Sequence, residues 1–187
     1  MSAKAVDTVV TYLAMQAGPR MLPPKPTGPL LALMKVEKIP LHYYRYLYNA
    51  VGTSWLWFER LLLDDAGLAA KIHAPNVEIY VLYADGAPAG YYELDFMSKE
   101  RTNLVYFGLM PEWTGRKIGP WLLGSAVSEG FSRGAKELTV NTCTLDHPAA
   151  LPLYQRLGFR PVARENRRLS VPADLAIPAH IAAPTTP

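Results

Sequence analysis

A chain of 187 residues, half of them hydrophobic, is long enough for one globular domain with a sizeable core, and a second domain is not expected. Its 19 basic and 16 acidic residues leave a net charge of only +3 without a long Lys/Arg run, which argues against a nucleic-acid partner. The single cysteine, Cys143, excludes an internal disulfide, and the four histidines lack metal-ligand spacing, so no metal site is expected. No apolar run approaches the ~18 residues of a membrane span, and no signal peptide is recognisable, so we expect no membrane contact and a cytoplasmic protein.

The first half of the chain predicts short strands and helices. Residues 6–14 alternate in hydropathy like a strand, which we expect at a sheet edge, and residues 31–39 are a second strand candidate. Five prolines between residues 19 and 29 exclude a helix between these strands. Residues 41–63 are strongly aromatic and are interrupted by Gly-Thr-Ser at residues 52–54, which predicts two short helices. Their rings favour core packing.

A hairpin and a strand–helix–strand unit follow. Residues 78–83 and 88–97 are β-rich, and the turn between them contains Asp-Gly, a strong hairpin signal. Residues 103–110 are an apolar strand, and after a turn the pattern is helical to about Arg133. Residues 137–144 form another strand, which we expect to lie parallel to the first with a right-handed crossover.

A glycine-bearing turn connects the first strand of this unit to its helix. Gly115 and Gly119 let the backbone curl tightly, and Arg116 and Lys117 add positive charge beside the first helix amides, which lack partners inside the helix. Anions bind at such N-termini. Pro120 is expected at the first helical position, where its missing N–H costs nothing. The turn is a candidate phosphate site, with an ordinary strand–helix connection as the alternative.

Residues 153–159 read Leu-Tyr-Gln-Arg-Leu-Gly-Phe and follow the turn and the second strand. This order of pieces resembles the acyl-CoA-binding core of the GNAT superfamily of N-acetyltransferases over residues 31–162. The family loop of the pattern Gln/Arg-x-x-Gly-x-Gly/Ala, which holds the pyrophosphate of coenzyme A, falls on residues 114–119. Thr114 and Lys117 depart from that pattern, whereas Gly115, Arg116 and Gly119 fit it.

The resemblance implies an α/β (α+β) fold with a mixed, mostly antiparallel sheet, whose central parallel strand pair splays to admit acetyl-CoA and is flanked by helices. A single acyltransferase domain would take residues 1–170. Residues 160–171 read as its last strand, with its arginines on a solvated face. Residues 171–187 form a Pro/Ala-rich tail. The arginine-bearing strand and the apolar tail offer surfaces for a homodimer.

The resemblance also implies the contacts of acetyl-CoA, the co-substrate. The pantetheine arm would pair with the strand near Gly108, Leu109 and Met110, and the Leu109 amide would polarise the thioester carbonyl. His147 stands where the family often has an asparagine that contacts the arm, and the alternative for His147 is a helix cap. The pyrophosphate would lie on Gly115, Arg116, Lys117, Ile118, Gly119 and Pro120.

The acid and the base are assigned less directly. Tyr154 falls on the family tyrosine that protonates the leaving thiolate, with simple packing as the alternative. Asn103 falls on the glutamate that serves as base in some members, and an amide cannot accept that proton. Glu93 is therefore the substitute base, with Asp95 on the same face of its strand; either carboxylate could instead orient the amine or face water. Cys143 as an acylated nucleophile is a further alternative, although a lone cysteine in a strand is more often a small buried hydrophobe.

The predicted activity is direct transfer of an acetyl group from acetyl-CoA to a primary amine. The alternative is a domain of the same fold that binds acyl-CoA for sensing or regulation, without catalysis. In the family the early helices cover the acceptor side, so some aromatic rings of residues 41–63 are candidates for an acceptor pocket. The sequence leaves open a protein N-terminus, a lysine, a polyamine, an aminoglycoside and a small aromatic amine.

Overall fold

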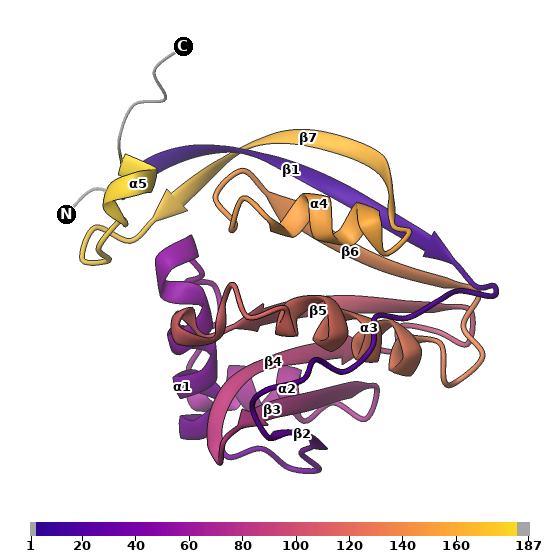
Figure 1. Ribbon diagram of the computed structural model, residues 1–187. Coiled ribbons are helices and arrows are strands. Elements are labelled where there is room, and N and C mark those ends of the chain that lie inside the picture. The colour runs from indigo at the N-terminus through magenta and orange to yellow at the C-terminus, as the bar shows by residue number, and fades with distance from the viewer. Residues whose placement is uncertain (1–2, 183–187) are drawn as a thin grey trace.

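One mixed sheet of seven strands, in the order β2-β3-β4-β5-β6-β1-β7, runs through the computed structural model, which describes residues 3–182 (Figure 1). Its strands are β1 (Lys4–Gln16), β2 (Leu31–Lys35), β3 (Val77–Ala84), β4 (Ala87–Asp95), β5 (Arg101–Leu109), β6 (Glu137–Cys143) and β7 (Arg160–Val171). Its helices are α1 (Leu41–Gly52), η1 (Thr53–Trp55), α2 (Asp65–Ile72), η2 (Pro111–Trp113), α3 (Ile118–Gly130), α4 (Ala150–Arg156) and α5 (Ala179–Ala182). Neighbouring strands are antiparallel except for β5 and β6, so the predicted fold class is confirmed.

The parallel pair β5 and β6 stays together over only part of its length. Pairing runs from Arg101 opposite Glu137 to Leu104 opposite Val140, and then stops. At the same level β5 carries one extra residue, Val105, relative to its other neighbour β4. A bulge of this kind bends a strand and re-aims its side chains. The two strands therefore separate toward their C-terminal ends, as the resemblance implied.

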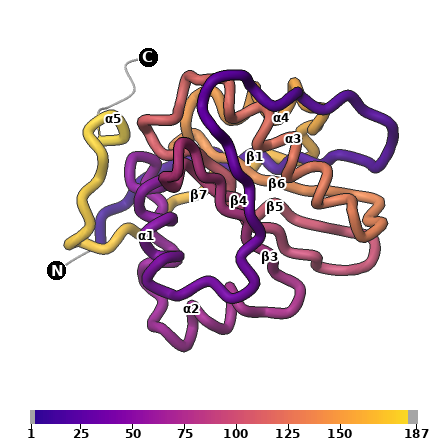
Figure 2. The backbone as a smooth tube through the Cα atoms, turned by 60° about the horizontal axis from the view of Figure 1, so that its bottom comes forward, coloured from indigo at the N-terminus to yellow at the C-terminus, as the bar shows by residue number. Residues whose placement is uncertain are grey.

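Helices cover both faces of the sheet, as the two views of Figures 1 and 2 show. Successive residues of β4 contact opposite groups: Tyr91 packs in the cluster that includes α1 and α2, and Tyr92 packs in the cluster that includes α3. The apolar stripe predicted for the helix after the turn is confirmed, because Leu122 and Val127 of α3 are fully buried against the sheet. No helix in residues 3–182 is long and apolar enough to cross a membrane.

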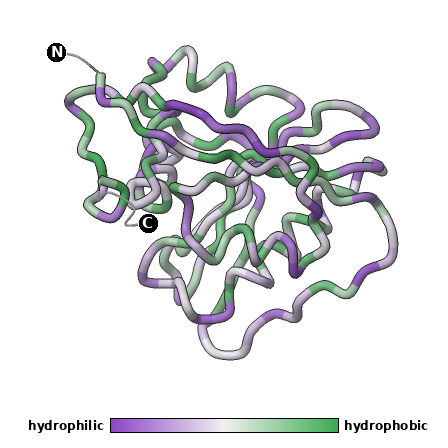
Figure 3. Tube along the Cα trace, turned by 90° about the horizontal axis from the view of Figure 1, so that it is seen from above, coloured by the Kyte–Doolittle hydropathy of each residue, from purple (hydrophilic) through white to green (hydrophobic). Residues whose placement is uncertain are grey.

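The N-terminal strand β1 lies inside the sheet, so its predicted place at an edge is wrong. Val10 is opposite Cys143 of β6 on one side and opposite Glu165 of β7 on the other. The edge is taken by β7, whose charged residues form a hydrophilic stretch in Figure 3. Both edges of β1 are therefore paired by strands from the far end of the chain.

Of three local predictions, two need correction and the third is confirmed. Only the first of the two helices expected in residues 41–63 forms; the second is a single turn, and α2 starts at Asp65, where the Asp64 side chain accepts from the Gly67 amide at 2.7 Å. Pro120 is the third residue of α3, still in the first turn, because the helix begins at Ile118. The predicted hairpin is confirmed, with positive φ at both residues of its Asp-Gly turn.

The described part of the tail, residues 172–182, packs on the loop that follows α1. Leu175, Ile177 and Ile181 join a hydrophobic cluster around Leu56 and Phe58. Residues 183–187 of the predicted tail lie outside the described residues. The tail thus contributes apolar contacts to the domain.

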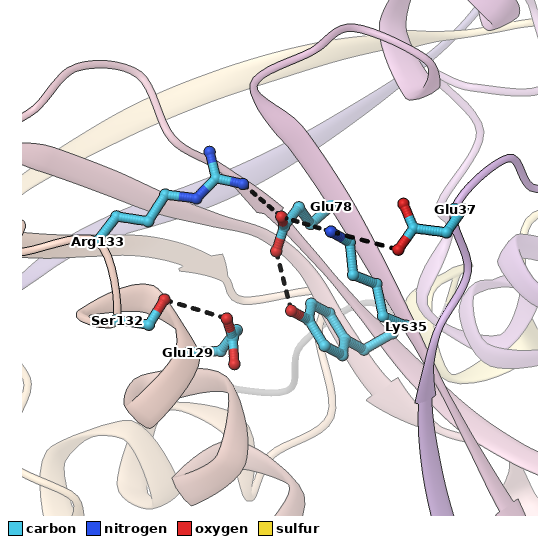
Figure 4. A network of polar contacts seen from close by, with 7 residues as sticks. Lys35, Glu37, Glu78, Glu129, Ser132 and Arg133 are labelled. Carbon is cyan, nitrogen blue, oxygen red and sulfur yellow. Dashed lines mark hydrogen bonds and ion pairs between the residues drawn. The ribbon is translucent and has the colours of Figure 1, made fainter.

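A buried carboxylate holds β2, β3 and the end of α3 together (Figure 4). Glu78 of β3 is 7% exposed, and it accepts hydrogen bonds from Lys35 at 2.8 Å, from Tyr80 at 2.9 Å and from Arg133. Burial raises the pKa of the Glu78 carboxyl, but the bonds from Lys35 and Tyr80 and the charge of Arg133 outweigh it and lower the pKa below 4.5. Two cations and a phenol therefore stabilise the ionised form.

We expect Glu78→Gln to lower the free energy of unfolding by about 1 kcal/mol at neutral pH. A carboxyl whose pKa is depressed in the folded state stabilises that state above the unfolded pKa, and the contribution is lost as pH falls through the folded value. The difference between wild type and variant should therefore shrink below pH 4.5. Urea unfolding at pH 7 and pH 3 measures both differences, and equal losses at the two pH values would contradict this account.

Candidate active site

A cavity of about 690 Å3 lies where β5 and β6 separate. One side is formed by the end of β5, the glycine-bearing turn and α4, and includes Gly108, Leu109 and Tyr154. The other side is formed by α1, residues 55–59, β1 and β7. Because the sheet is split here, one continuous cavity reaches both of its faces.

The turn before α3 has the geometry of an anion-binding loop. Gly115 has φ +74°, and Lys117, the residue before the helix, has φ 59° and ψ 14°. Lys117 thus adopts the left-handed conformation that glycine favours, at the position where the family pattern has a glycine. Gly115, Lys117, Gly119 and Pro120 all line the cavity. The N-terminus of a 13-residue helix points free amides and a partial positive charge to this place.

Three of the residues predicted to contact the cofactor do not line the cavity. The Arg116 guanidinium lies over the Trp113 ring, 4.8 Å from its centroid. Ile118 is fully buried in the core. The Met110 amide donates to the Ala89 carbonyl at 2.9 Å, which leaves it unable to pair with a cofactor arm. Gly108 and Leu109 remain as the strand residues at the cavity.

Tyr154 of α4 is buried between two rings and lines the cavity. Its ring makes edge contacts with Phe107 and Phe159, at centroid distances of 6.1 and 5.8 Å. It lines the cavity, and no hydrogen bond to its hydroxyl is found within residues 3–182. Burial, with a smaller effect of Asp146, raises the pKa of Tyr154 well above its ordinary value, so the phenol keeps its proton at neutral pH. Such a group can donate a proton but cannot serve as a base.

The loop between β6 and α4 adds a histidine and a carboxylate, and neither side chain caps α4. His147 lines the cavity, and its Nδ1 accepts from the Ala149 amide at 3.0 Å, just before α4 begins. The Asp146 carboxylate does not cap this helix: it accepts from the Thr142 hydroxyl at 2.7 Å and from the Trp57 indole N–H at 3.2 Å. Asp146 thereby links the loop of residues 55–59 to the half of the sheet that contains β6.

Cys143 at the end of β6 also lines the cavity. Burial is the main cause that raises the pKa of its thiol, and the charge of Asp146 adds to it. Only a thiolate is an effective nucleophile, so a raised pKa argues against an acylated cysteine.

Neither Glu93, the proposed base, nor Asn103, at the family's base position, lines the cavity. Glu93 is fully buried, and its oxygens accept from the Arg60 guanidinium at 2.6 Å and from the Tyr44 hydroxyl at 2.6 Å. The solvated orientation considered for Glu93 is therefore wrong. Asn103 lies in the paired part of β5, where its Oδ1 accepts from the Thr139 hydroxyl at 2.9 Å. Neither side chain is placed to take a proton from an acceptor.

Sequence reasoning missed Glu59, an exposed carboxylate that lines the cavity on the side of β1 and β7. No ion pair and no side-chain hydrogen bond of Glu59 is found within residues 3–182. The sequence signal that could have identified Glu59 is its position directly after Trp57 and Phe58, because an acidic residue within an aromatic run places a charge beside apolar side chains. The same run supplies rings to the cavity, which favours the acceptor-pocket interpretation for this part of residues 41–63.

The model of the Acetyltransferase (GNAT) family matches residues 42–159, more than half of the chain. This protein belongs to the GNAT family. The match spans α1 to the end of the Leu-Tyr-x-x-Leu-Gly-Phe segment and thus includes the glycine-bearing turn, α4 and residues 55–59, whereas the cavity residues of β1 and β7 lie outside it. The GNAT membership supports an acyltransferase, and acetyl transfer in general.

Known proteins similar to this GNAT domain are distant in sequence. A Bacillus subtilis (strain 168) protein named "Putative ribosomal protein bS18-alanine N-acetyltransferase" is 24% identical over 128 residues, 68% of this chain and 78% of its own length. A GCN5-related N-acetyltransferase from Sphaerobacter thermophilus superposes with a TM-score of 0.62 at 18% identity over 90% of this chain. An aminoglycoside N-acetyltransferase AAC(6')-Iy solved in complex with CoA has a TM-score of 0.55 at 22% identity, covering 74% of this chain and 93% of its own.

Several of these solved structures are longer than this GNAT domain. The domain spans 53% of the Sphaerobacter thermophilus chain and 62% of a functionally unknown conserved protein from Staphylococcus epidermidis ATCC 12228, which has a TM-score of 0.59 at 14% identity. At these identities the likeness establishes the fold. Acceptor and cofactor use are therefore argued from the residues of this chain.

We expect removal of either partner of the Arg60–Glu93 pair to lower the free energy of unfolding by about 3–5 kcal/mol, because the other charge is left buried without its counter-ion. Chemical denaturation of Glu93→Gln and of Arg60→Met measures each loss. The double variant with Glu93→Gln and Arg60→Met should lose less than the sum of the single losses. Additive losses would show that the two charges are not coupled.

Proposed function

We propose that this GNAT-family protein transfers an acetyl group from acetyl-CoA directly to a primary amine. The observation that carries the proposal is the continuous cavity at the split of β5 and β6, with an anion-binding turn on one side and an aromatic chamber on the other. The Tyr154 hydroxyl lines the same cavity without a partner in the described chain. Two substrates entering from opposite faces would meet beside this phenol.

The residues at the turn fit the pyrophosphate of acetyl-CoA. The α3 N-terminus offers unpaired amides, and Lys117 adds a full positive charge at the cavity. The pantetheine arm would lie along Gly108 and Leu109, where β5 has no partner on the side of β6. An added Cβ at Gly108 would overlap Val51 of α1, so the close approach of strand and helix requires glycine here. The CoA-complexed neighbour of the same fold supports this use of the cavity.

Tyr154 is assigned as the acid. The nitrogen–carbon bond to the acceptor forms as the carbon–sulfur bond breaks, and the leaving sulfur takes the Tyr154 proton. Of the two protons that the acceptor ammonium loses, one restores the phenol and the other goes to solvent. The raised pKa of Tyr154 keeps the donor protonated throughout the physiological range.

The second candidate function is acyl-CoA binding without catalysis. It is favoured by one observation: neither Glu93 nor Asn103 reaches the cavity, so the carboxylate that some family members use as a base is missing from that position. A non-catalytic domain would bind acetyl-CoA and leave it intact. Binding and turnover must therefore be measured separately.

We expect acetyl-CoA at about 100 times its dissociation constant to add ~2.7 kcal/mol to the stability of the folded protein. Gly119→Glu should abolish the rise, because it places a carboxylate at the anion-binding turn. Gly119→Ala is the matched control, since its Cβ would lie 3.8 Å from the Leu109 and Leu153 side chains, an ordinary contact. Thermal unfolding with and without acetyl-CoA measures the effect. No rise in the wild type would remove the assigned cofactor site.

We expect Tyr154→Phe to lower kcat at least tenfold without weakening acetyl-CoA binding. Phenylalanine preserves the ring contacts with Phe107 and Phe159 and removes only the proton donor. Thiol release in the presence of an amine panel measures turnover, and the thermal shift measures binding. An unchanged rate would exclude Tyr154 as the acid, and binding without any thiol release would favour the non-catalytic candidate.

A further inference from the structure

We propose that the acceptor is a primary monoamine on an apolar, aromatic body, and that Glu59 binds its ammonium group. The proposal rests on the proposed acetyl transfer and names its acceptor class. It is carried by the walls of the cavity side opposite the glycine-bearing turn. We call this side the acceptor chamber and define it by Tyr48, Trp55, Trp57, Phe58, Glu59 and Tyr106.

Three rings of the acceptor chamber contact one another. The centroids of Tyr48 and Tyr106, and those of Trp57 and Tyr106, are 5.1 Å apart, and those of Tyr48 and Trp57 are 5.6 Å apart. They come from α1, the loop after it and β5, so separate elements build one aromatic wall. Such a wall binds apolar and aromatic groups by burial and ring packing. The Arg60 guanidinium already lies over the Tyr106 ring, 5.3 Å from its centroid, so the wall is assigned to the apolar body of the ligand.

The chamber carries one unbalanced charge. The carboxylates that line the cavity are Asp146 and Glu59, and Asp146 already accepts three hydrogen bonds within the domain. Arg167 on β7 pairs with Glu165 at 3.0 Å, donates to the Tyr12 hydroxyl at 2.6 Å, and also feels the negative charge of Glu59. The two carboxylates Glu59 and Glu165 thus share one cation, and the remaining single negative charge matches a ligand with a single positive charge.

The negative charge of Glu59 affects two tyrosines of the aromatic wall. Burial is the main reason that the pKa values of Tyr48 and Tyr106 are raised, and the negative charge of Glu59 adds to both shifts. Glu59, Tyr48 and Tyr106 also line the same cavity, so a ligand in the chamber is exposed to both the carboxylate and the rings. A ligand whose ammonium group binds Glu59 and whose apolar body packs on the rings uses both the charge and the aromatic wall of the chamber.

The loop that carries Glu59 is held in place from both sides. Its next residue, Arg60, donates to Glu93 of β4 at 2.6 Å, and Trp57 donates to Asp146 beyond β6. Leu56 and Phe58 line the cavity and pack against the tail cluster, so the apolar wall has a second layer behind it. A preformed wall lowers the cost of ordering on binding, which suits a small rigid acceptor.

Polycationic acceptors fit the chamber poorly. A polyamine or an aminoglycoside carries several ammonium groups, and each needs a carboxylate or an equivalent acceptor when it leaves water. The chamber has one such carboxylate, and the other charged group nearby is the cation Arg167. The fold is shared with an aminoglycoside acetyltransferase, and at 22% identity this likeness establishes the fold alone.

The test compares four acceptors with the full chain at saturating acetyl-CoA: 2-phenylethylamine, spermidine, kanamycin A and a hexapeptide with N-terminal alanine. We expect kcat/KM for 2-phenylethylamine to exceed the other values at least tenfold. Glu59→Gln should raise the KM for 2-phenylethylamine at least tenfold and change the KM for acetyl-CoA less than twofold. Glu37→Gln, an exposed glutamate outside the cavity, is the matched control and should change neither.

Calorimetric binding of 2-phenylethylamine in the presence of CoA gives a readout that does not need turnover. Binding that Glu59→Gln weakens at least tenfold, without thiol release, would support the acceptor chamber and refute the proposed transfer. Faster acetylation of spermidine, kanamycin A or the peptide would overturn the monoamine proposal and leave the transfer intact. Absence of 2-phenylethylamine binding at millimolar concentration, or equal binding to Glu59→Gln, would also overturn it.

Discussion

The structure depends on where the hydrogen bonds between β5 and β6 stop. A sheet that stayed paired would bury every backbone group and leave no passage between its faces. Pairing ends after Leu104 and Val140, and the bulge at Val105 turns β5 away at the same level. Beyond this point the unpaired edges of β5 and β6 face the cavity instead of each other. Unpaired backbone groups near Gly108 are therefore available to a ligand, which is a use that an intact ladder could not offer.

Splitting a sheet weakens the link between its halves, and the loop after α1 restores part of that link. Arg60 fastens this loop to β4 through the buried Glu93, and Trp57 fastens it to the loop beyond β6 through Asp146. The Arg60 amide also donates to the Tyr48 hydroxyl of α1 at 3.4 Å. A buried ion pair adds little net stability compared with apolar packing, but it allows only one arrangement of its partners. Here that arrangement sets the position of the aromatic wall.

Local patterns predicted the elements well, and long-range contacts decided the rest. The Asp-Gly hairpin and the unit around the glycine-bearing turn depend on neighbouring residues, so their signatures are readable in the sequence. Glu93 looked like any carboxylate on an alternating strand, because its partner Arg60 lies 33 residues earlier in an irregular turn. Glu59 could not be distinguished from other surface acids until the walls around it were known. The position of β1 was wrong for the same reason, since no local feature reports which distant strands flank it.

The inserted β1 has a consequence for how the protein is made. This strand is synthesised first, yet both of its partners, β6 and β7, are among the last strands to leave the ribosome. Its β-rich sequence must wait unpaired while more than a hundred residues are added, which exposes it to misassociation and chaperones. Thr8, Val10 and Tyr12 of β1 also line the cavity. The cavity wall that β1 forms can thus be completed only after β6 and β7 have been synthesised.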